Sequence, residues 1–339
     1  MTEKKGIALA GTTLVDIVKM IDSYPEKGML TGIGEIRRAV GGCVPNVGID
    51  LAVIDPSLPV AAYGTIGADD NGEFLLKELS SRGINVSGLT LDAQEPTGFT
   101  DVMTVAGTGE RTFFTKAGAN ARFAPDEAFA STINEKIFHI GYILLMDALD
   151  EEDPVYGTRL ARLLHAVQER GILTSIDVVS RVGDRFREKM TPALRYSDYA
   201  IVNEIEACGV AGLSARDENG KLILENLEKA MDAMFACGVR RAVIIHCPEL
   251  GMIRRKGEKT TVQPSLDLPK GFIKGSVGAG DAFCAGCLYG LLRGYDDKHL
   301  LTFASSAAAC NLTAPDAVSG MRSCAEIEQL ASEYPLRKL

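Results

Sequence analysis

A loop of small residues leads directly into a carboxylate at the start of a segment with helical period. Residues 275–283 contain Gly275, Gly278 and Gly280, and Asp281 follows them. Glycines let the backbone approach an anion closely, and the unpaired amides and dipole of a first helical turn attract phosphate. A carboxylate beside such a phosphate-binding site repels the phosphate, so its presence there suggests a chemical role. Accepting a proton from an attacking hydroxyl in phosphoryl transfer is such a role, and an ordinary acidic residue in a first helical turn is the alternative.

Two better-known glycine motifs do not fit this loop. A dinucleotide fingerprint needs a third glycine at position 283, where this chain has Phe283. A Walker A loop needs Gly-Lys followed by Ser or Thr, but the only Gly-Lys pair, at Gly220, is followed by leucine. An NAD-dependent oxidoreductase, which the fold alone would allow, is therefore disfavoured.

The segments around the loop alternate between short apolar runs and helical periods, as β-α-β units do. Strands are expected at residues 7–11, 60–63, 137–140, 173–176, 199–202 and 242–245, with helices at 44–54, 72–82, 153–170 and 222–237. This order predicts a single domain over residues 1–339 with a largely parallel sheet covered by helices. Further helices are expected at 281–293, 297–312 and 323–332.

Two stretches break the alternation and predict a lid. Residues from about 15–40 and 98–115 have the pattern of strand pairs without a helix between them. We expect them to form a small antiparallel flap beside the main sheet. Arg111, on the last of these strands, is placed to contact a ligand from the lid, and a solvated strand arginine is the equal alternative.

The bulk properties are those of a water-soluble globular protein. Of the 339 residues 46% are hydrophobic and 24% charged, and no apolar run approaches the roughly 20 residues needed to span a bilayer. A net charge of −9 argues against a nucleic-acid partner. The eight cysteines are scattered through the chain, which predicts free thiols in the cytoplasm. No export signal is expected.

The loop at residues 275–281 resembles the second signature of the ribokinase-like, or PfkB, carbohydrate kinase family, which usually reads Asp-Thr-x-Gly-Ala-Gly-Asp. Residues 41–46 are similar to the family's Gly-Gly-x-x-x-Asn signature, and residues 67–72 to its Gly-x-Asp-x-x-Gly turn. Residues 203–206 match its Asn-x-x-Glu magnesium motif. The resemblance covers almost the whole chain and implies a three-layer α/β/α sandwich with a mostly parallel central sheet and a small β-sheet lid.

The resemblance implies a role for each nucleotide-side residue that matches. Asp281 would be the catalytic base, and Gly278, Ala279 and Gly280 would supply the anion hole for ATP. Gly251 ends residues 246–251, where the family commonly has a Thr-Leu-Gly-x-x-Gly nucleotide loop, although this chain departs from that pattern.

On the substrate side, the resemblance points to a sugar pocket near the amino terminus. Asp16 would accept hydrogen bonds from two hydroxyls of a polyol, with a turn or capping residue as the alternative. Gly41, Gly42 and Asn46 would line the same pocket, and without the resemblance Asn46 is a helix-start residue. Arg111 would complete the set from the lid.

Residues 203–206 match the family's magnesium motif, but two nearby segments differ from the family's sequence patterns. Asn203 and Glu206 would hold Mg²⁺ largely through water, with a capped surface helix as the alternative. Asp177 ends a strand where ligands gather in open α/β sheets, but residues 177–181 do not match the family's Asp-x-Asn-x-Arg. Gly275 replaces the aspartate that in many relatives helps hold an activating monovalent cation. We therefore leave a monovalent cation open and expect weak or no potassium dependence.

Together these features predict an ATP- and Mg²⁺-dependent kinase that phosphorylates a hydroxyl of a sugar. The alternatives are a nucleoside kinase and a catalytically silent sugar- or nucleotide-binding protein of the same fold. A free sugar is favoured because few aromatic residues lie near Asp16 and Asn46, while Arg37, Arg38 and Arg111 keep a phosphosugar open. The acceptor, its reacting hydroxyl and the oligomeric state stay open, and exposed flap strands often pair with a second copy to form a homodimer.

Overall fold

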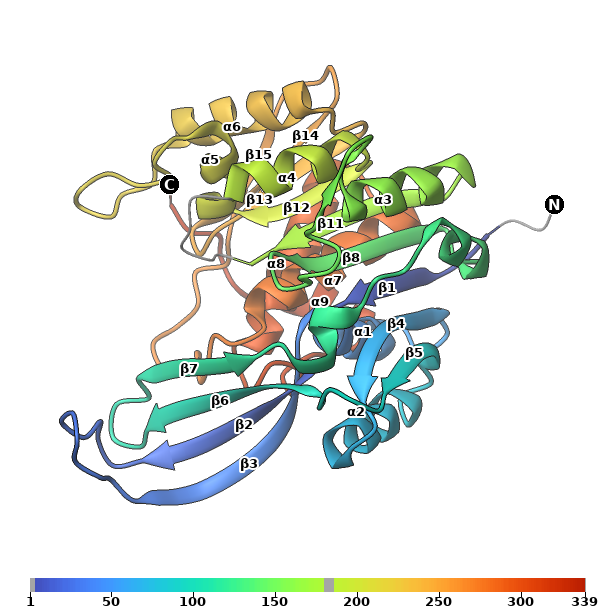
Figure 1. Ribbon diagram of the computed structural model, residues 1–339. Coiled ribbons are helices and arrows are strands. Elements are labelled where there is room, and N and C mark those ends of the chain that lie inside the picture. The colour runs from blue at the N-terminus through green and yellow to red at the C-terminus, as the bar shows by residue number, and fades with distance from the viewer. Residues whose placement is uncertain (1–3, 180–185, 339) are drawn as a thin grey trace.

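The fold is built around one large sheet. The computed structural model describes residues 4–179 and 186–338, and their arrangement is shown in Figure 1. The strand order is β15-β14-β13-β12-β11-β8-β1-β4-β5. Strands β13 through β5 in this order run parallel, whereas β14 and β15 are antiparallel to their neighbours. The strands are β1 (Ile7–Gly11), β4 (Val60–Gly67), β5 (Asn85–Asp92), β8 (Ile137–Ile143), β11 (Leu173–Val178), β12 (Tyr199–Asn203), β13 (Ala242–His246), β14 (Leu250–Arg255) and β15 (Thr261–Pro264).

Helices cover both faces of this sheet and explain why its inner strands are apolar throughout. On β1, Ile7 and Leu9 pack into the core with α1, α7 and α8, whereas Ala8 and Ala10 pack into the core with α3, α4 and α6. Such two-sided burial is typical of parallel sheets. The predicted three-layer sandwich is confirmed. The helices are α1 (Cys43–Ile54), α2 (Asp70–Ser80), α3 (Arg159–Glu169), α4 (Phe186–Arg195), α5 (Glu204–Ala211), α6 (Leu224–Cys237), α7 (Ala279–Arg293), α8 (Asp297–Asn311) and α9 (Cys324–Glu333), with 3₁₀ turns η1 (Gly118–Arg122) and η2 (Glu127–Thr132).

The predicted lid is present, with one correction to its topology. A four-stranded sheet in the order β3-β2-β6-β7 projects from the main body at the lower left of Figure 1. The pairs β2–β3 and β6–β7 are antiparallel, but β2 and β6 join them in parallel, so the flap is mixed rather than antiparallel. The reason is that β2 follows β1 and β6 follows β5. Because β1 and β5 run parallel in the main sheet, β2 and β6 both leave it from the same edge. The strands are β2 (Leu14–Ile21), β3 (Ile33–Gly41), β6 (Gly98–Val105) and β7 (Arg111–Lys116).

The main local error concerns the helix expected at residues 153–170. Helix α3 begins only at Arg159, because the side chain of Asp153 accepts hydrogen bonds from the backbone amides of Val155 and Tyr156, at 2.9 and 2.8 Å, and closes a turn. The short strands β9 (Glu152–Asp153) and β10 (Gly157–Thr158) flank this turn. Helices α4 and α5 were not predicted as elements of their own.

All eight cysteines lie among the described residues and are free thiols, as expected. Cys284 and Cys287, which form a C-x-x-C pair, are both buried in α7 and pack in the core. No helix within residues 4–179 and 186–338 combines the length and the hydrophobicity of a membrane span.

The turn that starts α2 ties the main sheet to the lid. Asp69 is the N-cap of α2, and its Oδ1 accepts hydrogen bonds from the amide of Gly72 at 2.9 Å and from the hydroxyl of Thr97 at 2.6 Å. Its Oδ2 accepts from the amide of Thr97 at 2.8 Å. Thr97 immediately precedes β6, so one carboxylate anchors both a helix and a lid strand.

We therefore predict that Asp69→Ala lowers the free energy of unfolding by about 1–3 kcal/mol, because a cap and a buried tie to Thr97 are both lost. The neighbouring variant Asp70→Ala removes an exposed carboxylate and should change stability by less than about 0.5 kcal/mol. Urea unfolding followed by circular dichroism measures both. Equal losses in the two variants would contradict this role of Asp69.

Candidate active site

The candidate site lies at the carboxyl ends of the parallel strands, where open α/β sheets bind ligands. Tyr142 lies near the end of β8, Asp177 near the end of β11, and Asn203 and His246 end β12 and β13. The amino-terminal turn of α7 faces the same edge. A cavity of about 120 Å³ has walls formed by Tyr142, Asp177, Val178, Asn203, Glu206, His246, Gly278, Gly280 and Asp281.

The amino terminus of α7 depends on glycine. Gly278 is the N-cap and has a φ of 77°, in the left-handed region. A Cβ atom built there would lie 2.5 Å from the carbonyl oxygen of Ala317, so a larger residue does not fit. Ala279 and Gly280 form the first turn of α7, and their amides and the helix dipole give this end of the helix a positive potential. The predicted anion-hole residues are thus next to one another and to the cavity.

Asp281 is the third residue of α7 and is only 7% exposed. Its Oδ1 accepts a hydrogen bond of 2.6 Å from the hydroxyl of Tyr142, and its Oδ2 accepts one of 2.8 Å from Nδ2 of Asn46. Burial raises the pKa of Asp281 to about 6, although the bonds from Tyr142 and Asn46 oppose the rise. A carboxylate with a pKa just below neutrality is suited to act as a general base.

Of the predicted substrate residues, Gly41 and Arg111 lie near a second carboxylate, Asp16 on β2. Burial, and then the negative charge of Asp281, raise the pKa of Asp16 to about 7, and the charge of Arg111 lowers it. A Cβ atom at Gly41 would lie 2.7 Å from Oδ1 of Asp16, so the glycine makes room for this side chain. Gly42, with a φ of 88°, is the N-cap of α1, the helix that carries Asn46.

Arg111 does extend from the lid toward this region. Its guanidinium donates a hydrogen bond of 2.9 Å to the carbonyl oxygen of Pro315, in the segment after α8. Its charge also acts on Asp16. Arg111 therefore contacts the main body from β7 instead of standing free in solvent.

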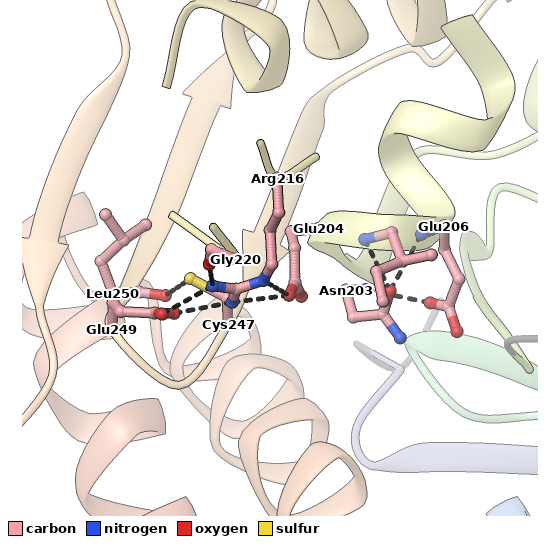
Figure 2. Close-up of polar contacts among 9 residues, drawn as sticks. Asn203, Glu204, Glu206, Arg216, Gly220, Cys247, Glu249 and Leu250 are labelled. Atoms are coloured by element: carbon pink, nitrogen blue, oxygen red, sulfur yellow. Dashed lines mark hydrogen bonds and ion pairs between the residues drawn. The ribbon is translucent and has the colours of Figure 1, made fainter. Parts of the chain in front are cut away.

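Asn203 and Glu206 form a capping box at the start of α5, as Figure 2 shows. The side chain of Asn203 accepts hydrogen bonds from the amides of Ile205 and Glu206 at 3.0 and 2.9 Å, and Oε2 of Glu206 accepts one from the amide of Asn203 at 2.9 Å. Both residues also line the small cavity. Asn203 and Glu206 therefore cap α5 and also face the cavity. Their role in capping does not exclude them as metal ligands.

Asp177 lies in the same cavity, near Glu206 and Asp281. Burial, followed by the charges of Glu206 and Asp281, raises the pKa of Asp177 well above its usual range. Its Oδ1 accepts a hydrogen bond of 2.7 Å from the amide of Val178. The rest of the sequence segment considered with it, Ser180 and Arg181, lies outside the described residues.

A larger cavity of about 470 Å³ adjoins the small one and shares Asn203, His246 and Gly280 with it. His246 packs against Phe283 with 4.9 Å between ring centroids, and Cys247 and Pro248 continue the wall. Gly251 lies behind this wall on β14, and a Cβ atom there would meet Leu301 and Phe283 at 3.1 and 3.3 Å. Gly251, which was predicted to contact ATP, therefore does not line either of these two cavities.

Arg216 braces the wall of the larger cavity. Its Nη1 and Nη2 donate to the two carboxylate oxygens of Glu249 at 2.7 and 2.9 Å, while Nε and Nη2 donate to Oε1 of Glu204 at 3.0 and 2.8 Å (Figure 2). The hydrogen bonds from Arg216 hold the pKa of Glu249 down at about 2. One guanidinium thus joins the start of α5 to the turn between β13 and β14.

Sequence reasoning missed Tyr142 and Arg216. Tyr142 lies beyond the strand predicted at residues 137–140, and Arg216 lies in a loop without a motif. The only signal for Tyr142 was its position next to a strand end. A side chain at position 275 would lie 2.7 Å from the carbonyl oxygen of Ala314, so the backbone there is packed where the family usually has aspartate. Weak potassium dependence stays a prediction.

Comparison with known proteins gives consistent matches along the chain. The model of the pfkB family of carbohydrate kinases matches residues 4–324. The chain is 26% identical to an ATP-dependent ribose-1-phosphate kinase of Halopiger xanaduensis, over 88% of this chain and 89% of that one. It is 23% identical to the 2-dehydro-3-deoxygluconokinase of Escherichia coli K12, over 86% and 89%. The structure of Arabidopsis thaliana ribokinase with ribose and ATP superposes with a TM-score of 0.78 at 20% identity, covering 97% of this chain and 99% of that one.

We predict that Arg216→Lys lowers the free energy of unfolding by about 1–2 kcal/mol, because one ammonium group cannot serve both carboxylates. The matched control is Arg159→Lys, since Arg159 forms a single exposed ion pair with Glu151 and its replacement should cost less than about 0.5 kcal/mol. Urea unfolding at neutral pH gives both values. Indistinguishable losses would show that the bridge from Arg216 to Glu204 and Glu249 adds nothing to stability.

Proposed function

Because the chain belongs to the pfkB family of carbohydrate kinases, we propose that it transfers the γ-phosphoryl group of ATP to a hydroxyl of a sugar, with Asp281 as the general base. The observation that carries this proposal is the placement of Asp281. It is a buried, hydrogen-bonded carboxylate at the positive end of α7, with one cavity beside it and a larger one adjoining. A protein that only binds sugar or nucleotide has no need of such a base.

The two cavities suggest how the nucleotide lies. Apolar side chains such as Leu266, Ile273 and Leu312 line the larger cavity, which suits a flat heterocycle. Its shared wall at Gly280 leads to the first turn of α7, where the amides preceding Asp281 would receive the phosphates. The γ-phosphate would then lie close to Asp281, and Asp16 would hold the acceptor on the opposite side.

Mg²⁺ fits the donor set of the small cavity. Asp177, Asn203 and Glu206 offer the oxygen ligands that this ion prefers. Burial, followed by the charges of Glu206 and Asp281, raises the pKa of Asp177, and a cation at this cluster would favour its charged form. When bound through Asn203 and Glu206, largely by way of water, Mg²⁺ would neutralise charge on the transferred phosphoryl group.

The residues of the chain would then act in turn on the acceptor hydroxyl. Asp281 accepts its proton as the oxygen attacks the γ-phosphorus, and the bond from this phosphorus to the β,γ-bridging oxygen breaks and releases ADP. The amides at the start of α7 stabilise charge on the phosphoryl oxygens. Tyr142 and Asn46 fix the direction of the carboxylate. The lid strands β2 and β7 carry Asp16 and Arg111 over the acceptor, which limits access by water, a competing acceptor.

The acceptor is proposed to be a free sugar, with an anionic sugar as the second candidate. The anionic sugar stays a candidate because the positive charge of Arg111 acts on Asp16, near the proposed acceptor site. One of the relatives is named for ribose-1-phosphate, which is such an acceptor. A nucleoside is less favoured, although one relative is named a nucleoside kinase.

We also propose that two copies associate through the lid in the cytoplasm. Ile36 on β3 and Phe113 and Phe114 on β7 are 60%, 57% and 57% exposed, and they occupy the two outer strands of the flap. Large apolar side chains on unpaired edge strands favour pairing with another copy. Eight free thiols suit a reducing compartment.

We predict that Asp281→Asn lowers turnover by a factor on the order of 10² or more while leaving the unfolding midpoint nearly unchanged, because an amide cannot accept the proton. ADP formation with a panel of free sugars, phosphosugars and nucleosides measures activity and acceptor together. The matched control is Asp22→Asn, an exposed position between β2 and β3, which should retain full turnover. Near-normal activity of Asp281→Asn would refute the assignment.

The pH dependence follows from the same group. The pKa of Asp281 is raised from its ordinary value to about 6, and only the ionised form accepts a proton. Turnover at saturating ATP and Mg²⁺ should therefore be maximal above pH 7 and should fall about tenfold per pH unit well below pH 6. A rate that stays flat down to pH 4.5 would show that another group is the base.

A further inference from the structure

A second acid, Asp50, lies one helical turn from Asn46 on α1 and is fully buried. Within the described part of the chain, neither of its carboxylate oxygens has a hydrogen-bond partner. The charges that act on it, those of Asp281 and Asp316, are negative, and with burial as the main cause they raise its pKa well above the usual range. A fully buried carboxyl group without a hydrogen-bond donor beside it favours its neutral form, which carries a hydroxyl hydrogen that it can donate.

The side-chain amide of Asn46 contains a buried oxygen that needs a hydrogen-bond donor. An ionised Asp281 can only accept hydrogen bonds, so the NH₂ group of Asn46 must face it, as the 2.8 Å contact has it. The amide oxygen of Asn46 then points away from Asp281. This oxygen is buried and lacks a donor among the residues that the structure describes. A buried acceptor without a donor is costly, so a donor is required here.

We propose that Asp50 is a positioning residue whose protonated carboxyl donates a hydrogen bond to Oδ1 of Asn46 and so keeps the NH₂ group of Asn46 turned toward Asp281. The four-residue spacing places the two side chains next to each other on one face of α1. That face is buried, and the charge of Asp281 acts on Asp50 across it. This inference rests on the proposed role of Asp281 as base and adds a residue that lies outside the sequence motifs described above.

The consequence concerns the ionisation of Asp281. Without the donor, the amide of Asn46 can turn over and present its oxygen to the carboxylate, which favours the protonated and inactive form of Asp281. The Asp50 variants below leave the other groups around Asp281 and Asp50 unsubstituted. These groups are Asp16 on β2, Arg111 on β7, Cys43 on α1, Tyr142 on β8, Asp177 on β11, Glu206 on α5, His246 on β13, Cys284 on α7, Cys310 on α8 and Asp316.

Two kinds of substitution separate a donor from a charge. Asp50→Asn keeps the size and an N–H donor but has no charge, whereas Asp50→Leu and Asp50→Val keep an apolar filling without any donor. In the Leu and Val variants, the midpoint of the acid limb of turnover should rise by about one pH unit, which lowers turnover about fivefold at pH 6 and hardly at pH 8. The KM for ATP should stay within about twofold of the wild-type value. Asp50→Asn should follow the wild-type profile.

Two controls frame this result. Tyr142→Phe removes the other donor to Asp281 and should shift the acid limb in the same direction. Ile54→Ala, one turn further along α1 at a buried position, should lower the unfolding midpoint without moving the acid limb. A general loss of structure would lower turnover equally at all pH values, and the Asp50 variants are not expected to behave in that way.

The titration of the Asp281 carboxyl can be followed without activity, by carbon-13 NMR of the full-length protein labelled at aspartate, with Asp281→Asn used to assign the signal. We expect its midpoint to rise in Asp50→Leu or Asp50→Val and to stay at the wild-type value in Asp50→Asn. If the wild-type protein has no kinase activity but shows this pattern, the proposed function fails while the positioning role holds. An unmoved midpoint in the Leu and Val variants overturns the inference. So does a shift in Asp50→Asn equal to theirs, because that result would assign the effect to a negative charge on Asp50.

Discussion

The structure depends on the cost of burying one carboxyl group. Asp281 is placed at the start of α7, where water is largely excluded and its charged form is disfavoured. Tyr142 and Asn46 each donate a hydrogen bond that partly restores that charged form. The three side chains come from α7, β8 and α1, so the layers on both sides of the sheet edge must be correctly packed before this balance exists. The chemistry of the site is thus a result of the whole fold.

The same edge of the sheet also concentrates negative charge. Asp177, Glu206 and Asp281 line one small cavity, and Asp16 lies near enough to Asp281 to be affected by its charge. Burial is the main cause of the raised pKa values of Asp16 and Asp177, and these negative neighbours add to it. Such clustering opposes folding on its own. The helix terminus at Gly278 and the guanidinium of Arg111 supply only part of the compensation. A site of this kind is prepared for ligands that bring or carry cations.

Much of this arrangement could be predicted from the sequence, and the limits have physical causes. Local motifs identified Asp281 and its glycines because a helix start is set by neighbouring residues, and the alternation of strands and helices predicted the sheet. Tyr142 escaped notice because its role depends on a partner 139 positions away. The parallel pairing of β2 with β6 was missed for the same reason, since α1, β4, α2 and β5 lie between the two strands in the chain. Asp153, which delays the start of α3, shows that one side-chain turn can override a helical period.

The hydrogen bond from Arg111 to the carbonyl oxygen of Pro315 joins strand β7 of the flap to the segment that follows α8. Pro315 lies two residues before Ala317, whose carbonyl oxygen packs against Gly278 so closely that no Cβ atom fits between them. The short segment from Pro315 to Ala317 therefore links β7 of the flap to Gly278, the N-cap of α7. The flap and the start of α7 are thus joined directly by this segment, in addition to their separate connections to the main sheet.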